Sequence, residues 1–172
     1  TGERNTAIGQ NSLATSTTAT GNTSVGSDSL PATTTGGYNT AVGYVALQTN
    51  TTGTFNTASG YKALKSNTTG ACNIAVGACS LNSTTTGIEN TALGFLTLGN
   101  NTTASGNTGL GKYALGGNST GAYNTAVGWH SLAANTTAAY NTAVGHSALT
   151  SNTTGTVNTA VGACAMFDST TG

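Results

Sequence analysis

The sequence predicts an all-β protein, a parallel β-solenoid or β-roll with one seventeen-residue repeat per coil and ten coils. Three observations predict this fold class. A motif built on Asn-Thr-Ala-Val-Gly returns at a fixed interval, with no insertion or deletion. The interval is too short for the helical-hairpin repeats, which take about 33 residues or more. It is also rich in Gly, Thr and Asn, which disfavour helix and favour short strands and turns.

The repeat organises the whole chain, so residues 1–172 form a single repetitive segment. We number each copy from its first Asn, which is position 1. A disordered low-complexity chain needs no constant period, whereas stacked coils do. Both ends of the segment, Thr1-Gly2 and Thr171-Gly172, fall in the same phase of the unit, which predicts a piece of a longer array or subunits that stack end to end. The ten copies begin at Asn5, Asn22, Asn39, Asn56, Asn73, Asn90, Asn107, Asn124, Asn141 and Asn158.

Comparison of the ten copies shows which positions the fold restricts. Coils stacked at the strand spacing of about 4.7–4.9 Å would form a rod of about 45–50 Å, with each position a ladder of like residues. We expect the aliphatic positions 4 and 9 to form the core and the Gly at position 5 to occupy a sharp corner. We expect the Asn at position 1 to hydrogen-bond along the axis. The expected ladders include Val42, Val76, Val127 and Val144 at position 4, Leu47, Leu64, Leu132 and Leu149 at position 9, Asn39 and Asn56 at position 1, and Gly43 and Gly60 at position 5.

The remaining positions suggest how the rod meets its surroundings. Positions 6, 7, 10, 11, 16 and 17 vary freely and are expected to face outwards. Eight of the ten aromatic residues fall at positions 6 and 17, where they either contact glycan rings or a neighbouring fibre, or pack over the corners of the roll. Because two large aliphatic residues per coil make a thin core, we expect lateral association of chains, with the small residues at positions 3 and 8 allowing close approach.

The unit Asn-Thr-Ala-Val-Gly-x-x-Ala resembles the head repeat of YadA-type trimeric autotransporter adhesins, whose motif runs Ser-x-Ala-Ile-Gly-x-x-Ala in a shorter coil. Residues 39–46 and 141–148 carry the match. The longer Asn-Thr-Thr-Gly units are similar to those of phage tail-fibre-like proteins and bacterial surface fibres. The resemblance implies a left-handed parallel β-roll, three chains around one axis and a role in surface attachment. The three extra residues per coil depart from the adhesin pattern.

Composition excludes several functions. Only 5% of the residues are charged and the net charge is zero, so nothing neutralises a phosphate backbone and no nucleic-acid partner is expected. No apolar run is long enough to span a bilayer, and no membrane insertion of this segment is expected. We expect no cofactor and no metal, because no Asp column exists. His130 and His146 lie in variable positions without a carboxylate at a repeated offset, so we expect no enzyme.

The three cysteines match no zinc or redox motif. Cys79 and Cys164 share position 7 but stand five coils apart, beyond the reach of a disulfide bond. The short spacing leaves a bond between Cys72 and Cys79 open, and free thiols are the favoured interpretation.

Asn-x-Thr/Ser sequons recur in the Asn-Thr-Thr turn that starts at position 12. They predict either N-linked glycosylation or simply favourable turn chemistry. The Thr that follows can also carry O-linked sugar. The candidate glycosylation sites are Asn50, Asn67, Asn101, Asn118, Asn135, Asn152, Thr52 and Thr69.

The regular Thr columns also suggest that the chain binds ice. A flat ice-binding face usually carries outward Thr residues two apart, and positions 12 and 14 are both Thr only at Thr33/Thr35 and Thr84/Thr86. That array is poor.

The sequence therefore predicts a structural and adhesive extracellular fibre segment, the shaft or head of a surface adhesin or tail-fibre-like protein on a cell or virion. The expected partners are copies of the chain, as a homotrimer or filament, and surface glycans. A self-assembling, glycosylated bacterial filament is the first alternative, and an ice-binding solenoid is the second.

Overall fold

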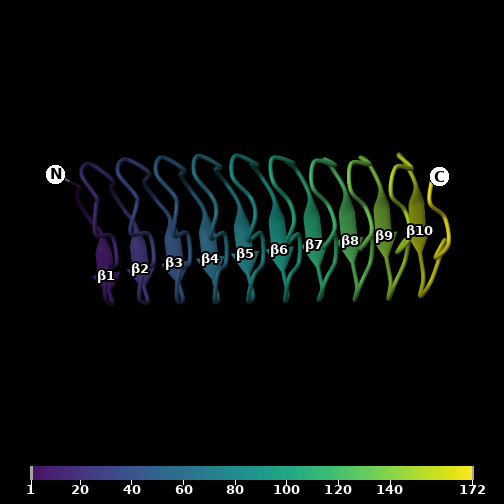
Figure 1. Ribbon diagram of the computed structural model, residues 1–172, viewed down its shortest axis with the longest axis horizontal. Helices are drawn as coiled ribbons and strands as arrows, with labels where there is room; N and C mark the ends of the chain where they lie inside the picture. The colour runs from purple at the N-terminus through teal and green to yellow at the C-terminus, as the bar shows by residue number, and fades with distance from the viewer. Residues whose placement is uncertain (1, 172) are drawn as a thin grey trace.

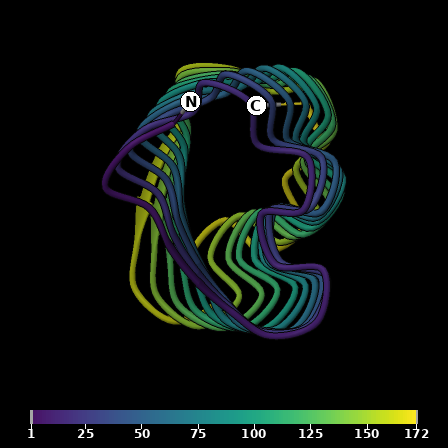
Figure 2. The same cartoon turned by 90° about the vertical axis from the view of Figure 1, so that its left-hand side faces the viewer.

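The computed structural model describes residues 2–171 and confirms the predicted β-solenoid. Thr1 and Gly172, which belong to the predicted matching phase of the two ends, lie outside the described residues. Figure 1 shows the strands side by side along a rod, and Figure 2 shows the coils overlaying in one common outline along the axis. Residues 2–171 contain no helix. The strands are β1 (Thr6–Ile8), β2 (Thr23–Val25), β3 (Thr40–Val42), β4 (Thr57–Ser59), β5 (Ile74–Val76), β6 (Thr91–Leu93), β7 (Thr108–Leu110), β8 (Thr125–Val127), β9 (Thr142–Val144) and β10 (Thr159–Val161).

The register of the sheet confirms one repeat per coil. All ten strands of the described range lie in one sheet in chain order, and each pairs in parallel with the next. The pairing of β3 with β4 aligns Thr40 with Thr57 and Val42 with Ser59, an offset of one repeat. Each position of the repeat therefore forms a column along the rod, as the sequence predicts.

The strand occupies positions 2–4, and its alternation decides which side chains face the interior. Successive side chains of a strand point to opposite faces, so position 3 faces inwards while positions 2 and 4 face outwards. Ala41 is fully buried, whereas Val42 is 40% exposed. The prediction that position 4 forms the core is therefore wrong, including Val42, Val76, Val127 and Val144. The expectation that positions 3 and 8 allow chains to approach is also wrong, because Ala41 and Ala46 fill the inside of the coil.

The prediction for position 9 is confirmed, and this column is the aliphatic core. Its Leu side chains stack through the interior and are fully buried from the second repeat to the ninth. Their backbone is left-handed, with φ between 46° and 53° in those copies, and position 7 is left-handed as well. As a result the Val45 N–H donates to the preceding coil, at Ser27 O, while the Leu47 N–H donates to the following coil, at Ala63 O. The fully buried leucines are Leu30, Leu47, Leu64, Leu81, Leu98, Leu115, Leu132 and Leu149.

The Gly column at position 5 turns the corner after the strand, as predicted. Gly43 has a φ of 137°, which L side chains rarely adopt. A Cβ added there would lie 2.6 Å from the carbonyl oxygen of Gly60 in the next coil. Both the dihedral angle and the packing of the coils therefore require glycine at this position.

Two buried polar columns close the coils, with Asn at position 1 of every copy and Asn at position 12 of six copies. The Asn39 backbone N–H donates to Asn22 Oδ1 at 2.8 Å, and its side-chain Nδ2 donates to Gly53 O at 2.8 Å. Asn50, at position 12, donates from Nδ2 to the same Gly53 oxygen at 3.1 Å. Positions 1, 12 and 15 of one coil thus meet at a single carbonyl. The predicted hydrogen bonding of Asn39 and Asn56 along the axis is confirmed, and amide groups fill the part of the interior that the leucines leave.

Candidate functional surfaces

The outward side chains of positions 2 and 4 form one continuous surface over the sheet, which we call the outer sheet face. It carries Thr at position 2 and an aliphatic residue at position 4 in nine copies each, and neither column contains a charged residue. Leu93 is 45% exposed and Leu110 is 42% exposed. In-register pairing repeats the two groups from coil to coil, with Ile74 and Ser59 as the exceptions. Nothing in the described residues covers this apolar face of a parallel sheet.

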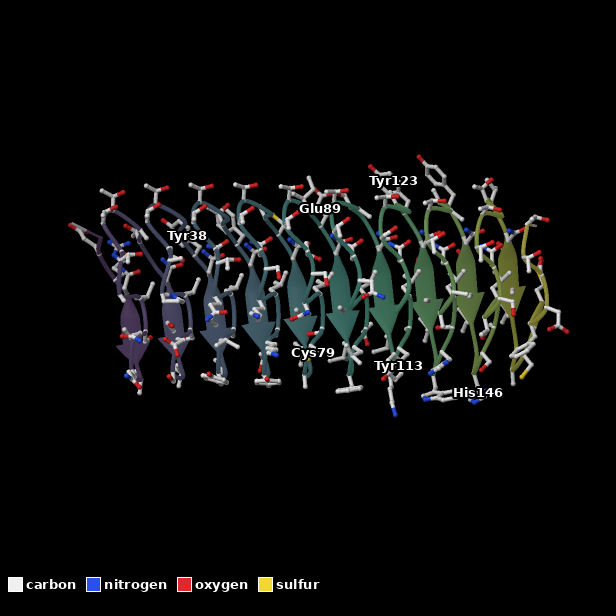
Figure 3. All side chains as sticks on the ribbon, viewed as in Figure 1. Tyr38, Cys79, Glu89, Tyr113, Tyr123 and His146 are labelled. Carbon is white, nitrogen blue, oxygen red and sulfur yellow. The ribbon has the colours of Figure 1, made fainter. Side chains whose placement is uncertain are left out.

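A second surface, the aromatic ridge, follows the turn after the strand and consists of the rings at positions 6 and 7. Tyr44 stacks on Tyr61 with ring centroids 6.0 Å apart. The rings of Phe95 and Tyr113 meet edge to face at 5.7 Å. Figure 3 shows Tyr113 and His146 on this side of the rod. The full set is Tyr44, Tyr61, Phe95, Tyr113, Trp129, His130 and His146.

A smaller aromatic column lies on the other side of the rod, at position 17, where Figure 3 labels Tyr38 and Tyr123. Tyr38 stacks on Phe55 at 5.2 Å and Tyr123 on Tyr140 at 5.3 Å, and all four rings are exposed. Rings of both columns therefore stack along the rod at the spacing of the coils. The outward orientation predicted for positions 6 and 17 is confirmed for these residues.

Two groups at position 7, one in the aromatic ridge and one beside it, have shifted pKa values. The Tyr61 phenol, acting as hydrogen-bond partner and through its charge, raises the pKa of Lys62 above its ordinary value. Burial lowers the pKa of His130 below its ordinary value, and Lys112 and His146 lower it further. His130 stacks on Trp129 at 3.9 Å, and Trp129 also stacks on His146 at 4.7 Å. The indole therefore contacts both imidazoles.

A groove of about 320 Å³ opens beside the ridge, where the sixth, seventh and eighth repeats meet. Leu96, Tyr113 and His130, all at position 7, supply its side-chain walls. Its floor is largely backbone, because Gly99 and Gly116 occupy position 10 and have no side chains. No charged side chain lines it.

The predicted N-glycosylation sites point into the solenoid. Asn67 is fully buried, and its Nδ2 donates to Asn50 Oδ1 at 2.8 Å and to Gly70 O at 3.0 Å. A sugar on this nitrogen would require the coil to open, so the turn-chemistry interpretation fits the fold and the N-glycan interpretation is wrong. The same burial applies to Asn50, Asn67, Asn101, Asn118, Asn135 and Asn152. By contrast, the side chains of Thr52 and Thr69 are exposed.

The remaining candidate groups stay apart. Cys72, Cys79 and Cys164 are free thiols, and the first and last are exposed. Within residues 2–171, no group of three or more His, Cys, Asp or Glu side chains is placed to hold a metal ion. The same range holds no helix long and apolar enough to cross a bilayer.

No protein-family model, curated protein or solved structure matches this chain significantly.

Sequence reasoning missed the outer sheet face and the groove. The alternation of positions 1 to 4 was the available signal for the face, because an inward Asn at position 1 requires an outward aliphatic residue at position 4. The signal for the groove was the coincidence of Gly99 and Gly116 at position 10 with large residues at position 7 in three successive repeats.

Proposed function

We propose that this chain is a segment of a structural and adhesive extracellular fibre, the shaft or head of a surface adhesin or tail-fibre-like protein. In this proposal it acts at the surface of a cell or virion, performs no catalysis, and associates with copies of itself through the outer sheet face. The rod supplies length and stiffness, and its ridges present side chains once per coil.

The observation that carries the proposal is an uncovered parallel sheet. In α/β proteins helical crossovers cover both faces of a parallel sheet, whereas the connections of this sheet run round the inner side of each coil. Here the inner face packs on the coil, while the outer sheet face exposes Val42, Leu93 and Leu110 to solvent. Extended apolar patches on soluble proteins usually mark sites of interaction.

A second copy of the chain is the partner that fits this face. The face is uncharged, so it offers nothing to a charged partner, and it repeats one pattern at the coil spacing along the whole rod. A parallel neighbour would present the same pattern at the same interval, so each coil could pack against an equivalent coil. The resemblance to trimeric adhesin repeats agrees with this arrangement.

The molar mass in solution tests the proposal. The wild type should sediment as an oligomer, with a trimer expected, and Val76→Lys with Val127→Lys should yield monomers, because buried unpaired charges are costly. The matched control, Thr86→Lys with Thr137→Lys, changes exposed position 14 in the same two repeats and should leave the mass unchanged. Circular dichroism checks that each variant remains folded. A wild type that is monomeric at high concentration would refute self-association through this face.

The alternative is a self-assembling filament with O-linked sugar. The exposed Thr column at position 14, which includes Thr52 and Thr69, supports it. Mass spectrometry of peptides from the chain isolated from its natural source distinguishes the two proposals, since hexose increments on peptides that contain residues 49–54 would favour the glycosylated filament.

Ice binding is supported by a different column from the one that the sequence suggested. The outer sheet face pairs a Thr with an aliphatic residue two positions on, at Thr40 and Val42 for example, in register along the rod. A regular array of hydroxyl and methyl groups on a sheet is the kind of surface that ice binding requires. A thermal-hysteresis assay on the monomeric chain tests this candidate, and no hysteresis at high concentration removes it.

A further inference from the structure

One rung of backbone hydrogen bonds between coils is missing at the groove. In neighbouring coils the position 11 N–H donates to the position 10 carbonyl of the next coil, as from Ser83 to Gly99 at 3.2 Å and from Gly117 to Ala133 at 2.9 Å. The Asn100 N–H and the Gly116 carbonyl, which should form the rung between these two, make no hydrogen bond among residues 2–171. The groove therefore contains both a free backbone donor and a free backbone acceptor.

A local turn lies on each side of the open rung. The Gly99 N–H donates to Leu96 O at 3.3 Å, and the Gly116 N–H donates to Tyr113 O at 3.0 Å, within their own coils. Each turn draws position 10 towards position 7. The rung from Ala32 is also missing, and Pro31 precedes it in the chain.

The side-chain wall of the groove is held in place by its neighbours. The Tyr113 ring lies between Phe95 at 5.7 Å and His130 at 5.0 Å, with edge-to-face geometry on both sides. His130 is in turn stacked on Trp129. A ring fixed in this way loses little entropy when a ligand binds.

The chemistry of the groove selects a small, neutral and amphipathic ligand. An aromatic ring attracts the weakly positive C–H groups of an aliphatic ring through its quadrupole. The free N–H and C=O require an acceptor and a donor, which a pair of hydroxyl groups supplies. No charged side chain lines the groove, and its volume is at the lower end of ligand-binding pockets. A purely apolar ligand would leave the two backbone groups unpaired.

We propose that the groove formed by Leu96, Tyr113, His130 and the backbone of Asn100 and Gly116 binds one neutral pyranose ring of a glycan. The sugar packs its C–H face on Tyr113, and its hydroxyl groups pair with the Asn100 N–H and the Gly116 carbonyl. This inference rests on the adhesive part of the proposed function and gives it a ligand class. The groove lies at positions 7, 10 and 11, apart from the outer sheet face.

Saturation-transfer NMR with three probes tests the proposal: methyl β-D-glucopyranoside, methyl β-D-galactopyranoside and N-acetyl-D-glucosamine, each at millimolar concentration. The protein contains a single tryptophan, so fluorescence of Trp129 gives a second readout beside the groove. At least one sugar should receive saturation and perturb the fluorescence. Tyr113→Ala should weaken binding roughly three- to tenfold, the factor expected for one aromatic contact.

Two further variants fill the groove with residues that position 10 already carries elsewhere. Gly116→Gln copies Gln48 and Gly99→Asn copies Asn82. A Cβ would lie 3.1 Å from Tyr113 O at Gly116 and 3.2 Å from Leu96 O at Gly99, so these neighbours must shift by a few tenths of an ångström. Each should abolish binding while the circular dichroism stays unchanged. Tyr123→Ala, which removes an exposed ring on the opposite side of the rod, should leave binding unchanged.

The outcomes are distinct. If none of the three sugars receives saturation, the proposal is overturned. It is also overturned if transfer to a sugar survives both groove-filling variants. The same holds if indole abolishes the transfer but an excess of a second sugar does not. Because these measurements use the wild-type assembly and leave the outer sheet face intact, an oligomeric chain that binds no sugar would refute the groove alone. A monomeric chain that binds sugar would refute the assembly alone.

Discussion

Replacement of Asn56 by Ala would interrupt the position 1 ladder in the middle of the rod. The wild-type Nδ2 donates to Gly70 O at 2.8 Å, and Oδ1 accepts the Asn73 backbone N–H at 3.0 Å. The Gly70 carbonyl keeps its bond from Asn67 Nδ2. The Asn73 N–H, however, loses its partner inside the coil, where no water reaches it in the buried column.

These changes set the expected magnitude. The lost amide hydrogen bond costs about 0.5–1.5 kcal/mol, and a buried N–H left without a partner costs about 1–3 kcal/mol. We therefore expect Asn56→Ala to lower the free energy of unfolding by about 2–4 kcal/mol. Thr52→Ala removes an exposed side chain four residues earlier and should change it by less than about 0.5 kcal/mol.

Urea unfolding followed by circular dichroism measures both variants against the wild type. All samples need the same protein concentration, because association contributes to apparent stability. Equal slopes in urea would show that the variants unfold the same amount of surface. If Asn56→Ala cost no more than Thr52→Ala, the buried ladder would not hold the coil closed, and the assignment of position 1 to the interior would fail.

Three other substitutions probe separate parts of the coil. Leu64→Ala should lower the free energy of unfolding in urea by about 2–5 kcal/mol, because it leaves a cavity in the buried column. Val76→Ala in monomeric chains should lower it by less than about 1 kcal/mol, because the Val76 side chain points outwards. Equal losses would contradict this inside–outside assignment. Gly43→Ala should lower the free energy of unfolding by more than about 2 kcal/mol or prevent folding, because the φ of 137° and the nearby Gly60 carbonyl both disfavour a Cβ. A variant with the wild-type melting temperature would disprove the close approach of the coils. The pKa of His130, measured by NMR, should lie below 6.5. Because the unfolded chain binds the proton more readily than the folded chain, the contribution of His130 to stability is complete above pH 6.5 and declines as the pH falls below that value. His130→Asn should flatten this pH dependence of stability. A pH dependence of stability that is identical in His130→Asn would contradict this assignment.

The period of the repeat was sufficient to predict the solenoid, because a constant spacing forces like residues into register once coils stack. It also located Leu64 in the core and Gly43 at a corner. Aliphatic character predicts the wrong side of the sheet for Val42, because an aliphatic side chain is not necessarily buried. The strand instead turns Ala41 inwards and Val42 outwards, and the interior is completed by amides such as Asn39 and Asn50. The repeat predicted that Asn39 hydrogen-bonds along the axis, but it did not predict that these amides are buried inside the coil.

The backbone at positions 7 and 9 was also beyond sequence reasoning. Leu47 and Lys62 have φ values of 49° and 57°, in a region that most residues with a Cβ avoid at a cost of roughly 1–2 kcal/mol. Nothing in their chemistry favours that conformation. It is imposed by the hydrogen bonds to the preceding and following coils, which form only when the neighbours are present. The groove beside Tyr113 depends on the same tertiary setting, because residues of three successive coils line it.

Distances between spin labels at one position of the repeat test the solenoid most directly. In a background where Cys72, Cys79 and Cys164 are Ser, labels at the exposed position 14 can be placed on Thr35 with either Thr103 or Thr154. Dilution with unlabelled chains leaves only distances within one chain. The pairs span four and seven coils, so pulsed EPR should give about 19 Å and about 34 Å, a rise of roughly 4.8 Å per repeat. Distances that do not grow in proportion to the number of repeats would contradict the stacked coil.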